Sequence, residues 1–138
     1  MIRGITITVD YGGSGQIVAE IDKDKITQVF RNLISNAIKF SPNGSNIHAQ
    51  FAIDANDVLF SLTDAGHGIP ENELKAIFDK FFQSTRNIAG SGGTGLGLLI
   101  CREYVIRHHG QIWAENNPAG GSTFCIRLPL RQAEQQLT

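Results

Sequence analysis

The chain has few of the residues that mark disulfide-rich, metal-binding or membrane proteins. It contains only two cysteines and one tryptophan among 138 residues. Cys101 and Cys125 are well separated, with no second thiol or histidine at zinc-finger spacing near either. The longest unbroken apolar run, Leu98 to Cys101, is far shorter than the roughly 20 residues that span a bilayer. We therefore expect two single buried thiols and no transmembrane segment.

The chain also has no large excess of either charge. It contains 12 basic and 13 acidic residues, and no run of five like charges occurs. This balance gives no electrostatic footprint for nucleic acid or for an anionic membrane. The N-terminus does not resemble a signal peptide. We expect a cytoplasmic chain without direct contact to nucleic acid or membrane, although a parent protein could be membrane-anchored.

What the sequence does contain is enough apolar material for one domain. Its length and 41% hydrophobic content allow a core that buries roughly two-thirds of the unfolded surface. We expect that domain over residues 1–130, followed by a polar tail over residues 131–138. No internal repeat or low-complexity tract interrupts it.

Periodicity along the chain predicts alternating strands and helices. Alternation at period two indicates strands, and apolar spacing of three and four indicates amphipathic helices. Pro70, followed by two glutamates, is typical of a helix start. The expected elements are a hairpin over 4–10 and 17–19, a helix over 22–40, strands at 47–53 and 58–62, a short helix over 70–77, a long helix over 94–108, and strands at 112–114 and 123–128.

This order predicts an α+β sandwich, a mixed sheet with helices packed on one face. Residues 83–93 are polar, rich in glycine and without periodicity. Such a segment inside a domain favours a functional loop over an interdomain linker. We expect it to act as a lid.

Four short blocks stand in an order that points to nucleotide chemistry. The first lies on the helix over 22–40, where Asn32, Asn36 and Lys39 share one stripe opposite the apolar face. An asparagine carbonyl can ligate Mg²⁺ and a lysine can meet a phosphate as a point charge. Taken alone, the stripe is better explained as a solvated helix face, and only the later blocks reverse that interpretation.

The second block is the turn from Asp64 to Pro70. Asp64 directly follows an apolar strand, and Gly66 and Gly68 would let a ligand or another backbone approach closely. A carboxylate can accept a hydrogen bond from the exocyclic amine of adenine, whereas the guanine carbonyl at that position would be repelled. The alternative is an acidic residue in an ordinary turn.

The third and fourth blocks are the aromatic-rich segment Phe78–Phe82 and the glycine-rich segment Gly93–Leu98. The segment runs into a predicted helix, whose free amides and dipole favour an anion such as triphosphate. A dinucleotide fingerprint over 90–95 follows a loop instead of a strand, and no Gly-Lys pair supports a Walker loop. Phe78 and its aromatic neighbours are better explained as core, and Arg86 is either a solvated loop residue or a contact of the terminal phosphate.

Together the four blocks resemble the N, G1, F and G2 boxes of the catalytic and ATP-binding domain of two-component sensor histidine kinases, and Gly121-Ser122-Thr123-Phe124 resembles a further element of that domain. These kinases belong to a superfamily with DNA gyrase, heat-shock chaperone ATPases and mismatch-repair ATPases. The resemblance covers residues 4 to 130. It implies a five-stranded mixed sheet with about three helices and a site for ATP and Mg²⁺.

The resemblance also implies roles for individual residues. Asn36 would bind Mg²⁺, Asp64 would hold the adenine amine, and Thr123 would back the adenine site. The candidate catalytic residues are Asn32, Lys39 and Arg86. The implied ATP-binding residues are Asn32, Asn36, Lys39, Phe40, Asp64, Gly66, Gly68, Ile69, Gly93, Thr94, Gly95, Leu96, Gly97, Leu98 and Thr123.

Two departures narrow the implied function. ATP-hydrolysing relatives place a glutamate where this chain has Asn32, and an amide is no general base. None of the four histidines stands in the phosphoacceptor motif of the kinases. The resemblance therefore implies phosphoryl transfer to a histidine on a separate dimerisation domain, with a response regulator downstream. Two alternatives remain open: a regulatory nucleotide-binding module without transfer, and a serine kinase of the anti-sigma type.

Overall fold

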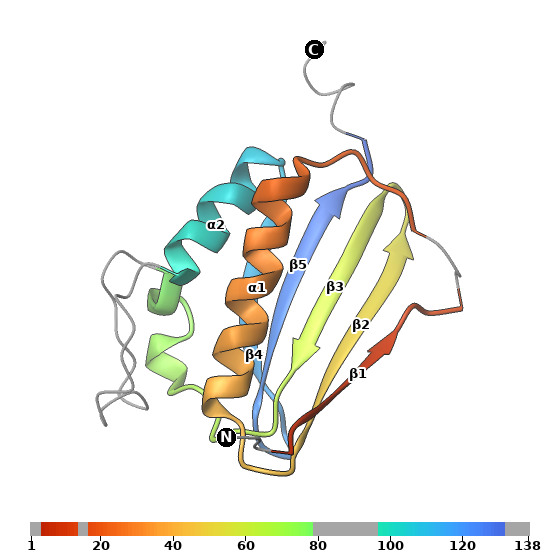
Figure 1. The fold of residues 1–138 in the computed structure, drawn as a ribbon. Helices are drawn as coiled ribbons and strands as arrows, with labels where there is room; N and C mark the ends of the chain where they lie inside the picture. Colours follow the sequence, from red (N-terminus) through yellow and green to blue (C-terminus); the bar gives the residue numbers. More distant parts are fainter. Residues whose placement is uncertain (1–3, 14–16, 79–96, 132–138) are drawn as a thin grey trace.

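The computed structural model describes residues 4–13, 17–78 and 97–131, which form a two-layer α+β sandwich (Figure 1). Two α-helices lie side by side on one face of a five-stranded sheet. This confirms the predicted fold class. In chain order the elements are β1 (Thr6–Asp10), α1 (Lys23–Phe40), β2 (Asn46–Asp54), β3 (Asp57–Thr63), the 3₁₀ segments η1 (Glu71–Glu73) and η2 (Ala76–Phe78), α2 (Gly97–Arg107), β4 (Gln111–Asn116) and β5 (Ser122–Pro129).

The sheet has the order β1-β2-β3-β5-β4, in which only β1 and β2 run parallel. The predicted hairpin over 4–10 and 17–19 is wrong, because β1 pairs with β2 and residues 17–19 form no strand. The chain instead leaves the sheet after Asp10, and near the end of β5 the Glu20 amide donates to the Leu130 carbonyl at 2.8 Å. Alternation revealed a strand with one apolar face, but a parallel partner this far along the chain leaves no local signal.

Helix α1 follows its predicted bounds closely. Asp22 caps it, because Asp22 Oδ1 accepts a hydrogen bond from the Lys25 amide at 3.2 Å, and the chain turns out of the helix at Ser41, just before Pro42. The residues at three- and four-residue spacing are buried as expected and pack on the sheet: Ile26, Val29, Leu33 and Ala37.

The predicted short helix over 70–77 forms as the two 3₁₀ segments η1 and η2 instead of an α-helix. The Glu73 amide donates to the Pro70 carbonyl at 2.8 Å, which is the tighter i to i+3 pattern of short helical pieces. This segment buries Ile77 and Phe78, and the Phe78 ring meets Phe124 edge-on. Phe78 is therefore core, as predicted, and the described residues contain two α-helices where about three helices were expected.

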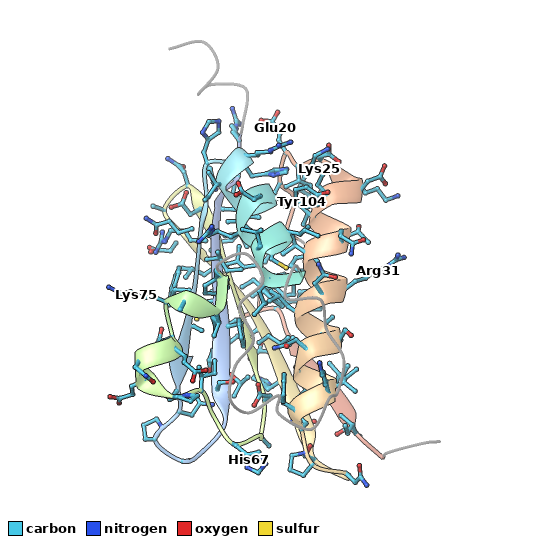
Figure 2. All side chains as sticks on the ribbon, turned by 90° about the vertical axis from the view of Figure 1, so that its left-hand side faces the viewer. Glu20, Lys25, Arg31, His67, Lys75 and Tyr104 are labelled. Carbon is cyan, nitrogen blue, oxygen red and sulfur yellow. The ribbon has the colours of Figure 1, made fainter. Side chains whose placement is uncertain are left out.

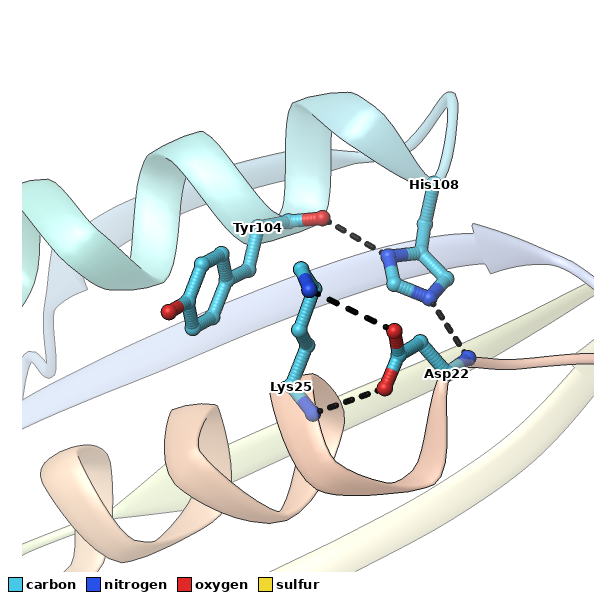
Figure 3. Close-up of polar contacts among 4 residues, drawn as sticks. All are labelled: Asp22, Lys25, Tyr104 and His108. Atoms are coloured by element: carbon cyan, nitrogen blue, oxygen red, sulfur yellow. Dashed lines mark hydrogen bonds and ion pairs between the residues drawn. The ribbon is translucent and has the colours of Figure 1, made fainter.

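A histidine joins the two helices where α1 begins and α2 ends (Figure 3). His108 Nε2 accepts a hydrogen bond from the Asp22 amide at 2.9 Å, and Nδ1 lies 2.8 Å from the Tyr104 carbonyl. Because Nε2 must be the acceptor, Nδ1 carries the hydrogen and donates a hydrogen bond to the Tyr104 carbonyl. Lys25 adds an ion pair to Asp22 at 3.4 Å and places its ammonium over the Tyr104 ring. The start of α1 is thereby fixed to α2.

The two cysteines are buried single thiols, as expected. Cys101 lies between the helices, and its Sγ donates to the Val29 carbonyl of α1 at 3.7 Å. Burial raises the pKa of the Cys101 thiol to about 12. Burial, followed by the nearby Glu115 carboxylate, raises the pKa of Cys125 to about 11. Within the described ranges no helix is long and apolar enough to cross a membrane.

Candidate nucleotide-binding site

The site is centred on Asp64, the first residue after β3, whose side chain is 3% exposed. Its Oδ1 accepts hydrogen bonds from the Gly66 amide at 2.9 Å and the Ser122 amide at 3.3 Å. Its Oδ2 accepts from the Ser122 hydroxyl at 2.8 Å. A carboxylate offers about four lone-pair positions, so the arrangement fixes the group in place and still leaves acceptor capacity for a ligand amine.

Glycines allow three segments to meet around this carboxylate. A Cβ on Gly66 would come within 2.5 Å of the Phe40 carbonyl at the end of α1. Gly121, at φ +83°, has the Asp64 carbonyl where its own Cβ would stand. The turn that follows β3 is therefore packed between the last residue of α1 and the connection from β4 to β5. No larger residue fits at these two positions without moving backbone.

The far end of the turn is held by Asn116, a residue outside the four blocks that no sequence pattern marks as functional. Asn116 Oδ1 accepts from the Ile69 amide at 2.7 Å, and its Nδ2 donates to the Ile69 carbonyl at 2.6 Å. Gly68 adopts φ +82°, and a Cβ there would lie 2.9 Å from Asn116 Oδ1. Gly68 is thus required by both its conformation and its neighbour. His67 lies between Gly66 and Gly68, exposed at the end of the molecule (Figure 2).

The residue that contacts Asp64 from β5 is Ser122 and not Thr123. Side chains alternate between the two faces of a strand, and Ser122 lies on the helix-covered face with an exposed fraction of 0%. The Thr123 hydroxyl donates to Asn117 Oδ1 at 2.7 Å and lies 3.0 Å from the Thr63 hydroxyl on the other face. The resemblance implied that Thr123 backs the adenine site, but the residue whose side chain contacts Asp64 is its neighbour Ser122.

The stripe on α1 begins with Asn32, whose amide is engaged at both ends. Asn32 Oδ1 accepts from Gln28 Nε2 at 3.0 Å, and Nδ2 donates to the Gly97 carbonyl at 3.2 Å. Gly97 is the first residue of α2 and part of the predicted phosphate-binding segment. Asn32 therefore connects α1 to that segment, and this contact does not depend on a phosphate.

The next members of the stripe are better placed for a ligand. The amide nitrogen of Asn36 is buried and has no hydrogen-bond partner among the described residues. An unpaired buried amide costs free energy, so a ligand that engages this side chain would relieve the cost. Lys39 places its ammonium 5.4 Å from the centre of the Phe40 ring. Phe40 is also the residue whose carbonyl lies close to Gly66. The stripe thus leads from α2 to the Asp64 turn.

The remaining predicted residues divide into two groups. Gly97 and Leu98 open α2, with Gly97 exposed and Leu98 packed against the core. The other predicted positions lie outside the described residues: Arg86, Gly93, Thr94, Gly95 and Leu96. The described residues contain no cluster of three or more histidine, cysteine or acidic side chains that could hold a metal ion.

A turn-bound carboxylate, an amide-bearing helix and this sheet order together define a nucleotide-binding ATPase domain. The chain belongs to the family of histidine kinase-, DNA gyrase B- and HSP90-like ATPases, whose family model matches residues 21–132. Within it, the chain corresponds to the ATP-binding catalytic domain of sensor histidine kinases. It is 42% identical over 127 residues to sensor histidine kinase WalK of Bacillus subtilis, covering 86% of this chain and 20% of that protein.

A second curated relative and a solved structure agree with this family assignment. The chain is 43% identical over 114 residues to sensor protein KdpD of Clostridium acetobutylicum, covering 82% of this chain and 13% of KdpD. Among solved structures, it resembles the catalytic domain of histidine kinase ThkA with a TM-score of 0.81 and 32% identity, over 94% of this chain and 82% of that one. The chain spans about a fifth or less of the curated relatives named here.

Proposed function

We propose that this chain binds ATP with Mg²⁺ and presents the terminal phosphate to a histidine on a separate dimerisation domain of the same parent protein. A response regulator would receive the phosphoryl group next and the module would work in the cytoplasm. The observation that carries the proposal is the fixed, buried Asp64 carboxylate beside the end of the α1 stripe. A solved complex of ThkA with the response regulator TrrA, 27% identical to this chain with a TM-score of 0.75 over 94% of this chain and 35% of that one, supports the downstream partner.

The nucleotide would bind with its base at Asp64 and its phosphates toward the α1 stripe. The Asp64 carboxylate would accept a hydrogen bond from the adenine amine, and Gly66 and Gly68 shape the turn around it. Asn36 would supply its side-chain oxygen as a ligand to Mg²⁺. Its buried Nδ2, which has no hydrogen-bond partner among the described residues, would donate to an oxygen of the bound nucleotide. Asn36 and oxygens of the nucleotide would hold the Mg²⁺, which would supply neutralising charge to the phosphates when bound.

The chain's own residues favour transfer over hydrolysis. Asn32 cannot accept a proton from water, and its amide already joins Gln28 to Gly97. A neutral imidazole needs little activation as a nucleophile, so in-line transfer would require only alignment and charge stabilisation. Lys39 and Arg86 would supply that charge, with Phe40 beside the nucleotide. Residues Gly93 to Leu98 would hold the phosphates.

The decisive experiment combines this chain with the separately produced acceptor-histidine domain of its parent, ATP labelled at the γ-phosphate, and Mg²⁺. Acid-labile, base-stable label on the acceptor domain is the expected result. Nucleotide binding without transfer would replace the proposal with the regulatory module, and acid-stable label on a partner would indicate the serine kinase. Absence of nucleotide binding would reject all three.

Two variants test the assigned roles, each with a matched control. Asp64→Asn should weaken ATP binding by about 1 to 3 kcal/mol. Asp10→Asn is its control, because Asp10 Oδ1 accepts from the Gly12 amide at 2.8 Å in the same two-residue pattern, at the exposed end of β1. Asn36→Ala should abolish the dependence of binding or transfer on Mg²⁺, with the exposed neighbour Ser35→Ala as control. Unchanged ATP affinity in Asp64→Asn would remove the adenine role.

A further inference from the structure

We propose that Asn116 is a positioning residue for the nucleobase: through Ile69 it holds the turn after Asp64 in the shape that adenine binding requires. This inference rests on the proposed function and assigns a role to a residue outside the four blocks. Asn116 is the last residue of β4, the edge strand at the opposite side of the sheet from β1. It reaches a backbone 47 residues away in sequence.

The contact is a complete pair of hydrogen bonds between one side chain and one backbone residue. Asn116 Oδ1 meets the Ile69 amide at 2.7 Å and Asn116 Nδ2 meets the Ile69 carbonyl at 2.6 Å. Because Ile69 offers one donor and one acceptor, only one orientation of the amide satisfies both. Asn116 thus pairs with Ile69 much as an adjacent strand residue would.

Only a carboxamide of this length can make that pair. An aspartate has the same shape but would place an oxygen against the Ile69 carbonyl, and a serine could satisfy at most one of the two groups. Both polar ends of Asn116 are engaged, so it would act on the nucleotide through Ile69 and not by touching it. That makes it a positioning residue and not a catalytic one.

The connection from β4 to β5 holds the Asp64 turn at both ends. Ser122 binds the Asp64 carboxylate at one end, and Asn116 binds Ile69 at the other. The connection is itself closed by backbone hydrogen bonds, from the Asn117 amide to the Gly121 carbonyl and from the Gly120 amide to the Asn117 carbonyl, both at 3.0 Å. Ser122 and Asn116 are therefore fixed relative to each other, and so are Asp64 and Ile69, the two ends of the turn that they hold.

The position of Ile69 connects this end of the Asp64 turn to binding of the nucleobase. Its side chain is 3% exposed and belongs to the core, so its position determines where Gly68 and Gly66 pass Asp64. If the Asn116 pair is lost, Ile69, the residue after Gly68, loses the two hydrogen bonds that hold its backbone to β4. The carboxylate would remain bound to Ser122, but the opposite wall of the base pocket would move.

The test separates binding of the base from binding of the phosphates. The affinities of Mg-ADP and of inorganic triphosphate with Mg²⁺ are measured by calorimetry for the wild type, Asn116→Asp and Asn116→Ser. Gln111→Glu is the control, because it makes the same amide-to-carboxylate change at an exposed position of the same edge strand. We expect ADP to bind about 10-fold more weakly to both Asn116 variants, as for a lost pair of hydrogen bonds, with triphosphate affinity unchanged.

The role of Asn116 would be overturned by wild-type ADP affinity in the variants, by an equal loss for ADP and triphosphate, or by a failure of both variants to fold, which would make the residue purely structural. The same loss in Gln111→Glu would attribute the effect to charge and also reject it. A wild-type protein that prefers triphosphate to ADP would instead contradict the proposed function, so the two failures are distinguishable.

Discussion

The Ser122 hydroxyl donates a 2.8 Å hydrogen bond to Asp64 Oδ2, and the two residues are 0% and 3% exposed. This bond predicts that Ser122→Ala weakens adenine-nucleotide binding by about 1 kcal/mol or more, because a buried carboxylate oxygen loses its donor. Calorimetry with ADP would measure the change. Thr123→Val is the matched control, since the Thr123 hydroxyl bonds on the other face of the sheet. A larger loss in Thr123→Val than in Ser122→Ala would restore Thr123 as the adenine-site residue.

The close approach of Gly121 to Asp64 predicts a large difference between two adjacent glycines. Gly121→Ala would place a Cβ against the Asp64 carbonyl, whereas Gly120 has nothing within 4 Å of its Cβ position. Both have positive φ, so both substitutions carry backbone strain. Gly121→Ala should cost about 1 to 3 kcal/mol more of unfolding free energy than Gly120→Ala. Equal costs in denaturant unfolding would contradict the described packing.

The bond from the Asp22 amide to His108 predicts that this histidine stabilises the fold. His108→Phe removes the acceptor, leaves the Asp22 amide and the Tyr104 carbonyl without their ring partner, and should lower the free energy of unfolding by about 1 to 3 kcal/mol. His67→Phe is the control because His67 is exposed and has no positive φ. Urea unfolding monitored by circular dichroism would show the difference. Equal effects of the two substitutions would mean that the link between the helices is not stabilising.

The two thiols should be almost inert in the folded protein. Burial raises the pKa of Cys101 to about 12 and that of Cys125 to about 11, so at pH 8 the reactive thiolate is on the order of 0.1% or less of either residue. Unfolding returns both to a pKa of about 8.5 and exposes them. A chromogenic disulfide reagent should therefore react with two thiols in denaturant and with almost none under native conditions at pH 8. Rapid native labelling would contradict the burial of Cys101.

The comparison of sequence and structure shows which features leave a local trace. Helix α1 and strands β2 to β5 lie close to their predicted positions, because each buries one face and its apolar residues repeat at the matching period. Residues 17–19 were predicted as the partner of β1, and this prediction is wrong because the pairing of β1 with β2 depends on the whole sheet. Residues 71–78 contain two 3₁₀ segments instead of one α-helix, since a segment this short after a proline has too few residues for its spacing to distinguish the two helix types.

The candidate site was predictable to the extent that single residues carry its chemistry. Asp64, Gly66 and Asn36 could be selected because a carboxylate, a small residue and an amide each suggest a role. The contacts of Ser122 and Asn116 could not, because side-chain bonds to a distant turn produce no periodicity. The choice between Ser122 and Thr123 depended on which face of β5 each residue occupies, and a shift of one residue reverses it.

The sheet order has a consequence for local stability. Strand β3 pairs with β2 on one side and β5 on the other, whereas β1 has only β2 as neighbour among the described strands. Amide protons of an edge strand exchange with solvent through small openings, and those of interior strands require larger ones. Asp64 and Ser122 stand at the ends of two interior strands. The base-binding end of the domain can therefore stay intact while β1 opens and closes, so hydrogen exchange at β1 would be independent of nucleotide.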